Sequence, residues 1–190
     1  MSNSDQAAFY RQQIERFGVG AEGVGWQSPA TQRRRFAVLE KALGPLAEVM
    51  LVDAGCGFGD LLLYLRKRGN TPRGYLGLEL LPEMAAEAQS RTGAKIHRCD
   101  ILKDRLPLAD CYVASGSMNR LTSLEARIFI RRCWEASGKR FVFNLLEGSG
   151  SREGFTYHRP GEIAGYCRSL EAKVRIIEGY LEGDFTIVME

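Results

Sequence analysis

The most informative part of this chain is residues 49–60, which read Val-Met-Leu-Val-Asp-Ala-Gly-Cys-Gly-Phe-Gly-Asp. An apolar run that ends in alternating glycines is typical of a buried strand that turns tightly beneath a ligand. Gly55, Gly57 and Gly59 carry no side chain and can adopt positive φ, so the backbone there can approach a bound molecule closely. We expect the helix after this turn to point its N-terminus at that molecule.

Composition narrows the class of protein. The chain has 190 residues, 45% of them apolar, which suits a single domain (1–190) with a full-sized core. Its 26 basic and 23 acidic residues nearly balance, which disfavours nucleic acid as a partner. No apolar stretch reaches the ~18 residues that span a bilayer, and the polar residues 2–6 lack the apolar core of a signal peptide. We therefore expect a cytoplasmic protein without a membrane partner.

Cysteine usage agrees with that compartment. The five cysteines are scattered and form no Cys-x-x-Cys pair for zinc or redox chemistry, so we predict reduced thiols and no metal site.

Short apolar segments alternate with amphipathic ones, which predicts an α/β fold with a doubly wound, mostly parallel seven-stranded sheet. The predicted strands are 49–53, 74–79, 94–98, 109–114, 140–145, 173–178 and 185–189. The predicted helices are 30–43, 61–68, 82–91, 124–136 and 160–169. The connector between the last two strands is too short for a crossover helix, so we expect an antiparallel C-terminal pair.

Three features in this order resemble class I S-adenosylmethionine-dependent methyltransferases. They are residues 52–59 (Val-Asp-Ala-Gly-Cys-Gly-Phe-Gly), the acid Glu79 at the end of the second strand, and Cys99-Asp100 after the third. The resemblance covers residues 49–119 well and implies a Rossmann-like methyltransferase fold. It also implies S-adenosylmethionine as the cofactor and S-adenosylhomocysteine as the product.

A narrower resemblance is to a small bacterial methyltransferase subgroup of unassigned substrate. It rests on residues 26–28 with 32–36, on 114–116 with Asn119, and on 184–186. In that subgroup the stretch before the first strand resembles a lid, so we predict an N-terminal helical lid over residues 1–45.

The resemblance assigns cofactor contacts to individual positions. Glu79 can accept both ribose hydroxyls, although a solvated strand-end acid is the competing interpretation. Asp100 can accept from the adenine amine and the N–H of Ile101 can reach a ring nitrogen, although Asp100 also suits a turn. Asp53 is expected to organise the glycine turn. The predicted cofactor-binding residues are Trp26, Arg35, Asp53, Gly55, Cys56, Gly57, Glu79, Asp100, Ile101, Ser115 and Gly116.

Within that set, Trp26 is predicted as a pocket wall and Arg35 as a partner of the cofactor carboxylate. The competing interpretation of residues 33–35 is a solvated basic helix face. Ser115 and Gly116 are expected beside the methionine portion of the cofactor.

Fewer residues are candidates for contact with the methyl-accepting substrate. Asn119 can reach a substrate or fix its own loop, and His158 is the candidate base. The sequence lacks the Asn-Pro-Pro-Tyr motif of amino-directed nucleic-acid methyltransferases. The loop 147–159 has the glycine and serine content of a mobile substrate loop. We predict methyl transfer to an O, N or C atom of a small molecule, with a protein side chain as second choice; the oligomeric state stays open.

Two other classes of function use similar features. A nicotinamide-dependent oxidoreductase also has a glycine-rich turn, but its Gly-x-Gly-x-x-Gly pattern requires a third glycine where this chain has Asp60. An acid at that helix start would also face a pyrophosphate unfavourably. A non-catalytic S-adenosylmethionine-binding module would carry the same binding residues as an enzyme.

Overall fold

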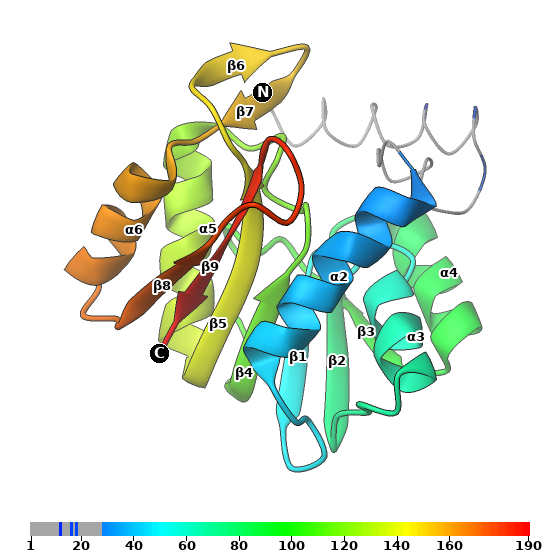
Figure 1. Ribbon diagram of the computed structural model, residues 1–190. Helices are drawn as coiled ribbons and strands as arrows, with labels where there is room; N and C mark the ends of the chain where they lie inside the picture. The colour runs from blue at the N-terminus through cyan, green and yellow to red at the C-terminus, as the bar shows by residue number, and fades with distance from the viewer. Residues whose placement is uncertain (1–11, 13–15, 17, 19–27) are drawn as a thin grey trace.

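A seven-stranded sheet with the order β3-β2-β1-β4-β5-β9-β8 forms the centre of the molecule (Figure 1). The computed structural model describes residues 12, 16, 18 and 28–190. The sheet strands are β1 (Met50–Ala54), β2 (Gly74–Glu79), β3 (Lys95–Arg98), β4 (Ala109–Ala114), β5 (Ser137–Leu146), β8 (Val174–Ile177) and β9 (Asp184–Met189). The helices are α2 (Pro29–Leu43), α3 (Asp60–Lys67), α4 (Pro82–Thr92), α5 (Ser123–Ala136) and α6 (Pro160–Ser169).

Strands β1 to β5 run parallel, whereas β9 is antiparallel to both β5 and β8. The predicted fold class and the antiparallel C-terminal pair are therefore confirmed. The strand order reverses between β1 and β4, because β2 and β3 lie on one side of β1 and the later strands on the other. In open α/β sheets ligands bind outside the carboxyl ends of the strands at this point.

Helices cover both faces of the sheet. On one face, α2 and α3 bury Leu39 and Leu65 against β1, β4 and β5. On the other face, α5 and α6 bury Phe129, Ile130 and Ile163 against the side chains of β1, β4, β5 and β9 that point to that face. Since both faces are covered, the inner strands are apolar on both sides and read as continuous apolar runs in the sequence.

Local signals set the helix ends close to the predicted positions. The Ser28 Oγ accepts a hydrogen bond from the Thr31 N–H at 3.2 Å, and α2 then begins with a proline. Gly44, at φ 75°, ends the same helix. Thr122 and Glu125 form a reciprocal capping box at the start of α5.

The segment 147–159 differs from the predicted loop, because it contains a β-hairpin of β6 (Gly150–Arg152) and β7 (Phe155–Tyr157). The hairpin projects from the carboxyl end of the sheet (Figure 1). Its Thr156 N–H donates to the Asn119 carbonyl at 2.8 Å, and the His158 N–H donates to the Leu146 carbonyl at the same distance. Strands of three residues carry too little periodicity to be recognised in the sequence.

A buried ion pair fastens α2 to the last strand. The Arg35 Nη2 lies 2.5 Å from the Asp184 Oδ2, and the two side chains are 10% and 1% exposed. Burial raises the pKa of Asp184, and Arg35 opposes that rise. Asp184 pairs with Leu146 at the end of β5, so the ion pair lies at the carboxyl edge of the sheet.

No helix in the described part of the chain is both long enough and apolar enough to cross a membrane.

Replacing Arg35 by methionine should lower the free energy of unfolding by about 3–5 kcal/mol, because Asp184 would remain buried without its partner. The measurement is urea unfolding followed by circular dichroism. The matched control is Arg34→Met, one residue earlier on the exposed face of α2, which should change stability by less than about 0.5 kcal/mol. Equal losses in the two variants would contradict this role of the ion pair.

Candidate functional site

The glycine turn after β1 folds back over the end of β2. The N–H groups of Gly55 and Cys56 both donate to the Leu78 carbonyl, at 2.8 and 3.0 Å. Gly55, Gly57 and Gly59 have φ values of 77°, 57° and 78°. A Cβ on Gly55 would lie 2.4 Å from the Ser117 Cβ, so only glycine lets the turn close against the loop after β4.

Cys56 packs inward rather than toward a ligand. Its Sγ would lie 2.7 Å from a Cβ on Gly77, so the lack of a side chain at this one position of β2 makes room for the thiol. Burial raises the pKa of Cys56 far above its usual value, and the charges of Asp53 and Glu79 add to the effect. The thiol therefore stays protonated, and only the backbone of Cys56 is available for binding.

Glu79 closes the turn from the β2 side. Its Oε2 accepts the Gly57 N–H and its Oε1 accepts the Leu81 N–H, both at 3.0 Å. Burial raises the pKa of Glu79, while these backbone hydrogen bonds lower it. Each carboxylate oxygen can accept a second hydrogen bond. The carboxylate is thus held rigidly and keeps capacity for a pair of ligand hydroxyls.

Asp53 lies at the end of β1 and is 2% exposed. Its Oδ2 accepts a hydrogen bond from the Tyr75 hydroxyl at 2.9 Å. Burial raises the pKa of Asp53 to about 7; the Tyr75 hydrogen bond lowers it, and the charges of Glu79 and Asp60 raise it further. Asp53 is therefore close to its midpoint of ionisation at neutral pH, directly behind the glycine turn.

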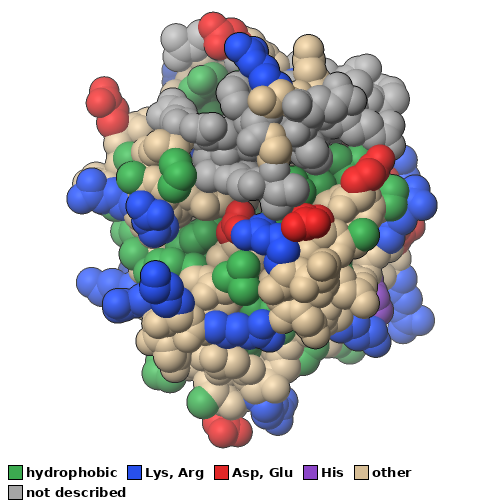
Figure 2. Space-filling view, turned by 90° about the vertical axis from the view of Figure 1, so that its right-hand side faces the viewer, with side chains coloured by type: hydrophobic (Ala, Val, Ile, Leu, Met, Phe, Trp, Pro, Cys, Tyr) green, Lys and Arg blue, Asp and Glu red, His purple; other side chains and the backbone are tan. Residues whose placement is uncertain are grey.

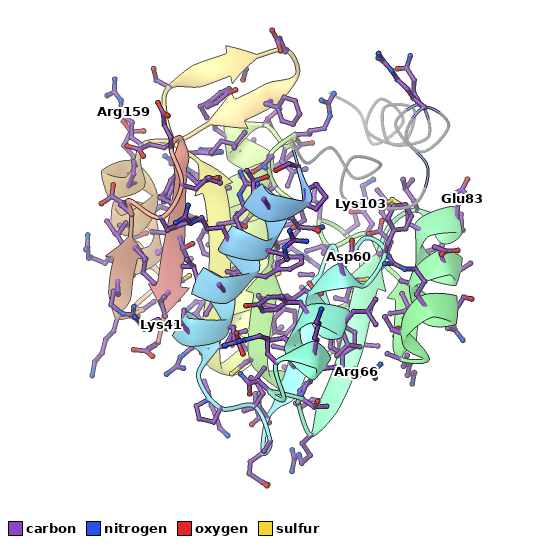
Figure 3. All side chains as sticks on the ribbon, turned by 45° about the vertical axis from the view of Figure 1, so that its right-hand side comes forward. Lys41, Asp60, Arg66, Glu83, Lys103 and Arg159 are labelled. Carbon is purple, nitrogen blue, oxygen red and sulfur yellow. The ribbon has the colours of Figure 1, made fainter. Side chains whose placement is uncertain are left out.

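Asp60, at the start of α3 in Figure 3, connects three elements. Its Oδ1 lies 2.7 Å from the Arg91 Nη2 of α4, and its Oδ2 accepts from the Gln32 Nε2 of α2 at 3.2 Å. Arg91 also donates to the Phe58 carbonyl inside the turn at 3.0 Å. The acid that breaks the dinucleotide pattern is thus part of the framework that holds the turn.

Asp100 makes the contacts expected of a turn aspartate. Its Oδ1 accepts the Leu102 N–H at 3.0 Å, and its Oδ2 lies 3.2 Å from the Lys103 Nζ. Ile101 is buried, and its carbonyl accepts from the Arg132 Nε at 2.7 Å. The segment after β3 is therefore fixed by its own hydrogen bonds, with Asp100 at the carboxyl edge.

The loop after β4 contains buried polar atoms without hydrogen-bond partners. Asn144 of β5 accepts the Gly116 N–H at 3.0 Å and so holds the loop. Among the residues that the structure describes, four buried side-chain atoms in or beside this loop have no partner: Ser115 Oγ, Ser117 Oγ, Asn119 Oδ1 and Asn144 Nδ2. Each unsatisfied buried group costs about 1–3 kcal/mol, so their concentration here is typical of a surface built for a polar ligand.

His158 lies farther along the same edge, beyond β5. It is 6% exposed, and its Nε2 has no hydrogen-bond partner in the described structure. It lines a cavity of about 160 Å³ together with Arg127 of α5 and Arg159, which precedes α6. Of these residues, Arg159 is labelled in Figure 3. Burial lowers the pKa of His158, the charge of Arg127 lowers it further, and Glu162 opposes them.

The structure thus brings most of the predicted site residues to one edge. The glycine turn, Glu79 and Ser115–Gly116 lie around the ends of β1, β2 and β4, whereas Arg35 pairs with Asp184 and His158 lines a separate cavity. Trp26 lies outside the described residues. Sequence reasoning missed Tyr75, Arg91 and Ser117. Their contacts connect positions distant in the chain, so no local pattern signals them.

Within the described residues, no cluster of three or more His, Cys, Asp or Glu side chains is placed to hold a metal ion.

Solved structures share this architecture. A TehB-like S-adenosylmethionine-dependent methyltransferase of Corynebacterium glutamicum is 19% identical, with a TM-score of 0.65 and 98% of each chain covered. A structure titled "DhpI-SAM-HEP complex" is 14% identical with a TM-score of 0.75, covering all of this chain and 99% of DhpI. The chain therefore has the methyltransferase fold.

A curated relative gives the family. The Mycobacterium tuberculosis protein named "Putative methyltransferase Rv1506c" is 32% identical over 150 residues, which cover 72% of this chain and 90% of the relative. The chain belongs to the methyltransferase family that this protein represents. No protein-family model matches it.

Replacing Asp53 by asparagine should remove a pH dependence of stability. Because the folded-state pKa of about 7 exceeds the unfolded value of 3.8, the folded protein binds more protons between these values, and stability falls as pH rises through them. Between about pH 5 and about pH 8 the wild type should lose about 2–3 kcal/mol more than Asp53→Asn, measured by urea unfolding. Parallel pH profiles of the two proteins would contradict a buried, proton-binding Asp53.

Proposed function

We propose that this methyltransferase uses S-adenosylmethionine and methylates a small molecule. The observation that carries the proposal is the glycine turn closed beneath Glu79 and opposite the unpartnered Ser115 and Ser117 hydroxyls. The glycine turn lets the cofactor lie close to the backbone, and the fixed Glu79 carboxylate suits its ribose hydroxyls. The unpartnered serine hydroxyls suit the polar groups at its amino-acid end. DhpI in a complex with S-adenosylmethionine supports the same choice.

The proposed contacts follow the carboxyl edge of the sheet. Glu79 accepts the ribose hydroxyls on its remaining lone pairs, and Gly55, Cys56 and Gly57 contribute backbone beneath the ligand. Ser115 and Gly116 lie at the methionine end. Asp100 and Ile101 form the adenine end, with Asp100 already oriented by its turn.

Asp53, Arg35 and Trp26 complete the set. Asp53 supports the turn from behind, through its contact with Tyr75. Arg35 lies at the same edge, where its ion pair with Asp184 fastens α2 to β9. We keep the predictions that the whole chain is one domain and that Trp26 is a wall of the pocket. The predicted lid 1–45 is corrected in its second part, because α2 (Pro29–Leu43) packs on a face of the sheet, so the lid is proposed only for the residues before α2.

When bound, the cofactor would supply an electrophilic methyl group on its sulfonium sulfur; the acceptor's lone pair would take the methyl group, and the sulfur would keep the electrons of the carbon–sulfur bond. The chain's residues hold the two reactants in line, which accounts for much of the rate acceleration in such transfers. An acceptor that is already an anion needs no base, whereas a hydroxyl or ammonium must lose a proton. On the acceptor side we propose Asn119, whose carbonyl is anchored by Thr156, and His158.

The surface supports a small acceptor. Lys and Arg side chains are dispersed among acidic and apolar ones on the face in Figure 2 and form no continuous basic stripe there. Nucleic-acid binding relies on such a stripe. The five cysteines are all free and buried, which supports the reducing cytoplasm as the location.

The main rival is nicotinamide binding. It would place a pyrophosphate at the start of α3, where Asp60 is fixed by Arg91 and Gln32. A carboxylate held there opposes a bound phosphate. A non-catalytic binding module would bind the same cofactor without turnover, so detection of methyl transfer separates it from an enzyme.

Replacing Glu79 by glutamine should weaken binding of S-adenosylmethionine and S-adenosylhomocysteine at least about tenfold, since the ribose would lose a charged acceptor. Isothermal titration calorimetry measures this directly. Glu135→Gln is the control, because this glutamate is 65% exposed at the far end of α5 and should leave the affinity unchanged.

Binding of NADH by the wild type without binding of either adenosyl ligand would overturn the proposal. Unchanged affinity in Glu79→Gln would remove Glu79 from the site even if the cofactor binds.

A further inference from the structure

The cavity beside His158 lies between the N-terminal ends of α5 and α6 and the β6–β7 hairpin. Arg127 reaches it from α5 and Arg159 from the residue before α6, while Ser149 and Gly150 contribute the hairpin side. The cavity is separate from the glycine turn, since none of its lining residues belongs to β1, β2 or the loops that follow them.

The wall of this cavity is positively charged. Arg127 contributes one guanidinium, which lies 5.3 Å from the centre of the Tyr166 ring, and none of the ion pairs found among the described residues includes it. Arg159 contributes a second, 3.5 Å from the Glu162 carboxylate, and these two side chains are 68% and 60% exposed. Such an exposed pair contributes little binding energy. The lining of the cavity therefore carries two arginines and one glutamate, a net positive charge.

The N-terminus of helix α6 lines the cavity, and its first turn contains one acid, Glu162. The helix has ten residues, and its N-cap Arg159 makes no side-chain capping hydrogen bond. An uncapped helix N-terminus favours a negatively charged group.

His158 provides the independent evidence for a ligand. Its side chain is more than nine-tenths buried, lines the cavity, and has an Nε2 without a partner in the described structure. The backbone on either side is fixed, because the His158 N–H donates to Leu146 and its carbonyl accepts the Gly148 N–H at 3.0 Å. A buried ring nitrogen held in this way, with nothing to bond, is suited to a ligand atom that accepts a hydrogen bond.

The cavity is joined to the methyl-transfer edge through shared elements. His158 bonds to the last residue of β5, and Asn144, two residues earlier on β5, holds the Gly116 N–H. The hairpin also bonds to Asn119 through Thr156. Strand β5 and the hairpin therefore connect the wall of the cavity directly to the edge where methyl transfer is proposed.

The volume of the cavity limits how large a part of the acceptor molecule it can hold. Complete small-molecule sites usually measure about 300–1,000 Å³, so about 160 Å³ accommodates one end of a substrate. A carboxylate or a phosphate is of this size and has the charge that the arginines require.

We propose that this cavity binds the anionic group, a carboxylate or a phosphate, of the small molecule that the enzyme methylates. Arg127 and Arg159 supply charge and His158 supplies a hydrogen bond, so His158 takes part in recognising the acceptor. The link to the methyl acceptor rests on the proposed function, whereas anion binding itself does not.

The test titrates the purified 190-residue chain, without cofactor, with inorganic phosphate and separately with acetate at constant ionic strength. Binding is measured by calorimetry and by the chemical shift of the His158 ring protons. The variants are Arg127→Gln and Arg131→Gln. Arg131 lies four residues later on α5, is 52% exposed and is outside the cavity, so it is the matched control.

We expect at least one anion to bind the wild type and to shift the His158 signals. Binding should weaken at least about tenfold in Arg127→Gln and stay unchanged in Arg131→Gln. The anion that binds more tightly identifies the group as carboxylate or phosphate. Since Arg127 is exposed, its replacement should leave the fold intact, which circular dichroism checks.

Absence of binding by both anions, or equal binding in the two variants, would overturn the anion site. Binding of S-adenosylmethionine is measured on the same samples. If it fails while Arg127-dependent anion binding persists, the proposed function and the acceptor assignment fall but the anion site stands.

Discussion

The close approach of the glycine turn to the loop after β4 is the constraint on which the rest of the site depends. A Cβ on Gly55 would lie 2.4 Å from the Ser117 Cβ. The N–H groups of the same turn donate to the Leu78 carbonyl and to the Glu79 carboxylate at the end of β2. The ends of β1, β2 and β4 are thereby fixed relative to one another. A ligand laid across them meets backbone, carboxylate and hydroxyl groups that need no rearrangement, which is the advantage of a preorganised site.

Longer contacts keep this edge in place from outside the sheet. Asp60 binds both Arg91 of α4 and Gln32 of α2, and Arg35 of α2 binds Asp184 of β9. Two helices and the last strand are thus tied to the region around the turn by buried or half-buried polar pairs. Removing one member of a buried pair leaves an uncompensated charge, so these residues serve the site through the rigidity of its supports.

The sequence predicted the elements of the sheet and the turn because their signals are local: an apolar run, glycines at fixed spacing, and an acid at the next strand's end. The hairpin β6–β7 was missed, since its strands are short and its anchor Asn119 is remote in the chain. Long-range polar pairs such as Arg35–Asp184 leave no periodicity at all. The role of His158 depends on a cavity assembled from α5, α6 and the hairpin, which only the fold reveals.

Hydrogen–deuterium exchange of the protein with and without S-adenosylhomocysteine measures directly whether the cofactor lies across the glycine turn. Bound ligand slows exchange of the amides that it covers and stabilises. We expect slower exchange in residues 53–59, 79–81 and 115–119, with residues 130–140 at the opposite edge unchanged. No protection at the turn, or protection confined to other segments, would contradict this placement of the cofactor.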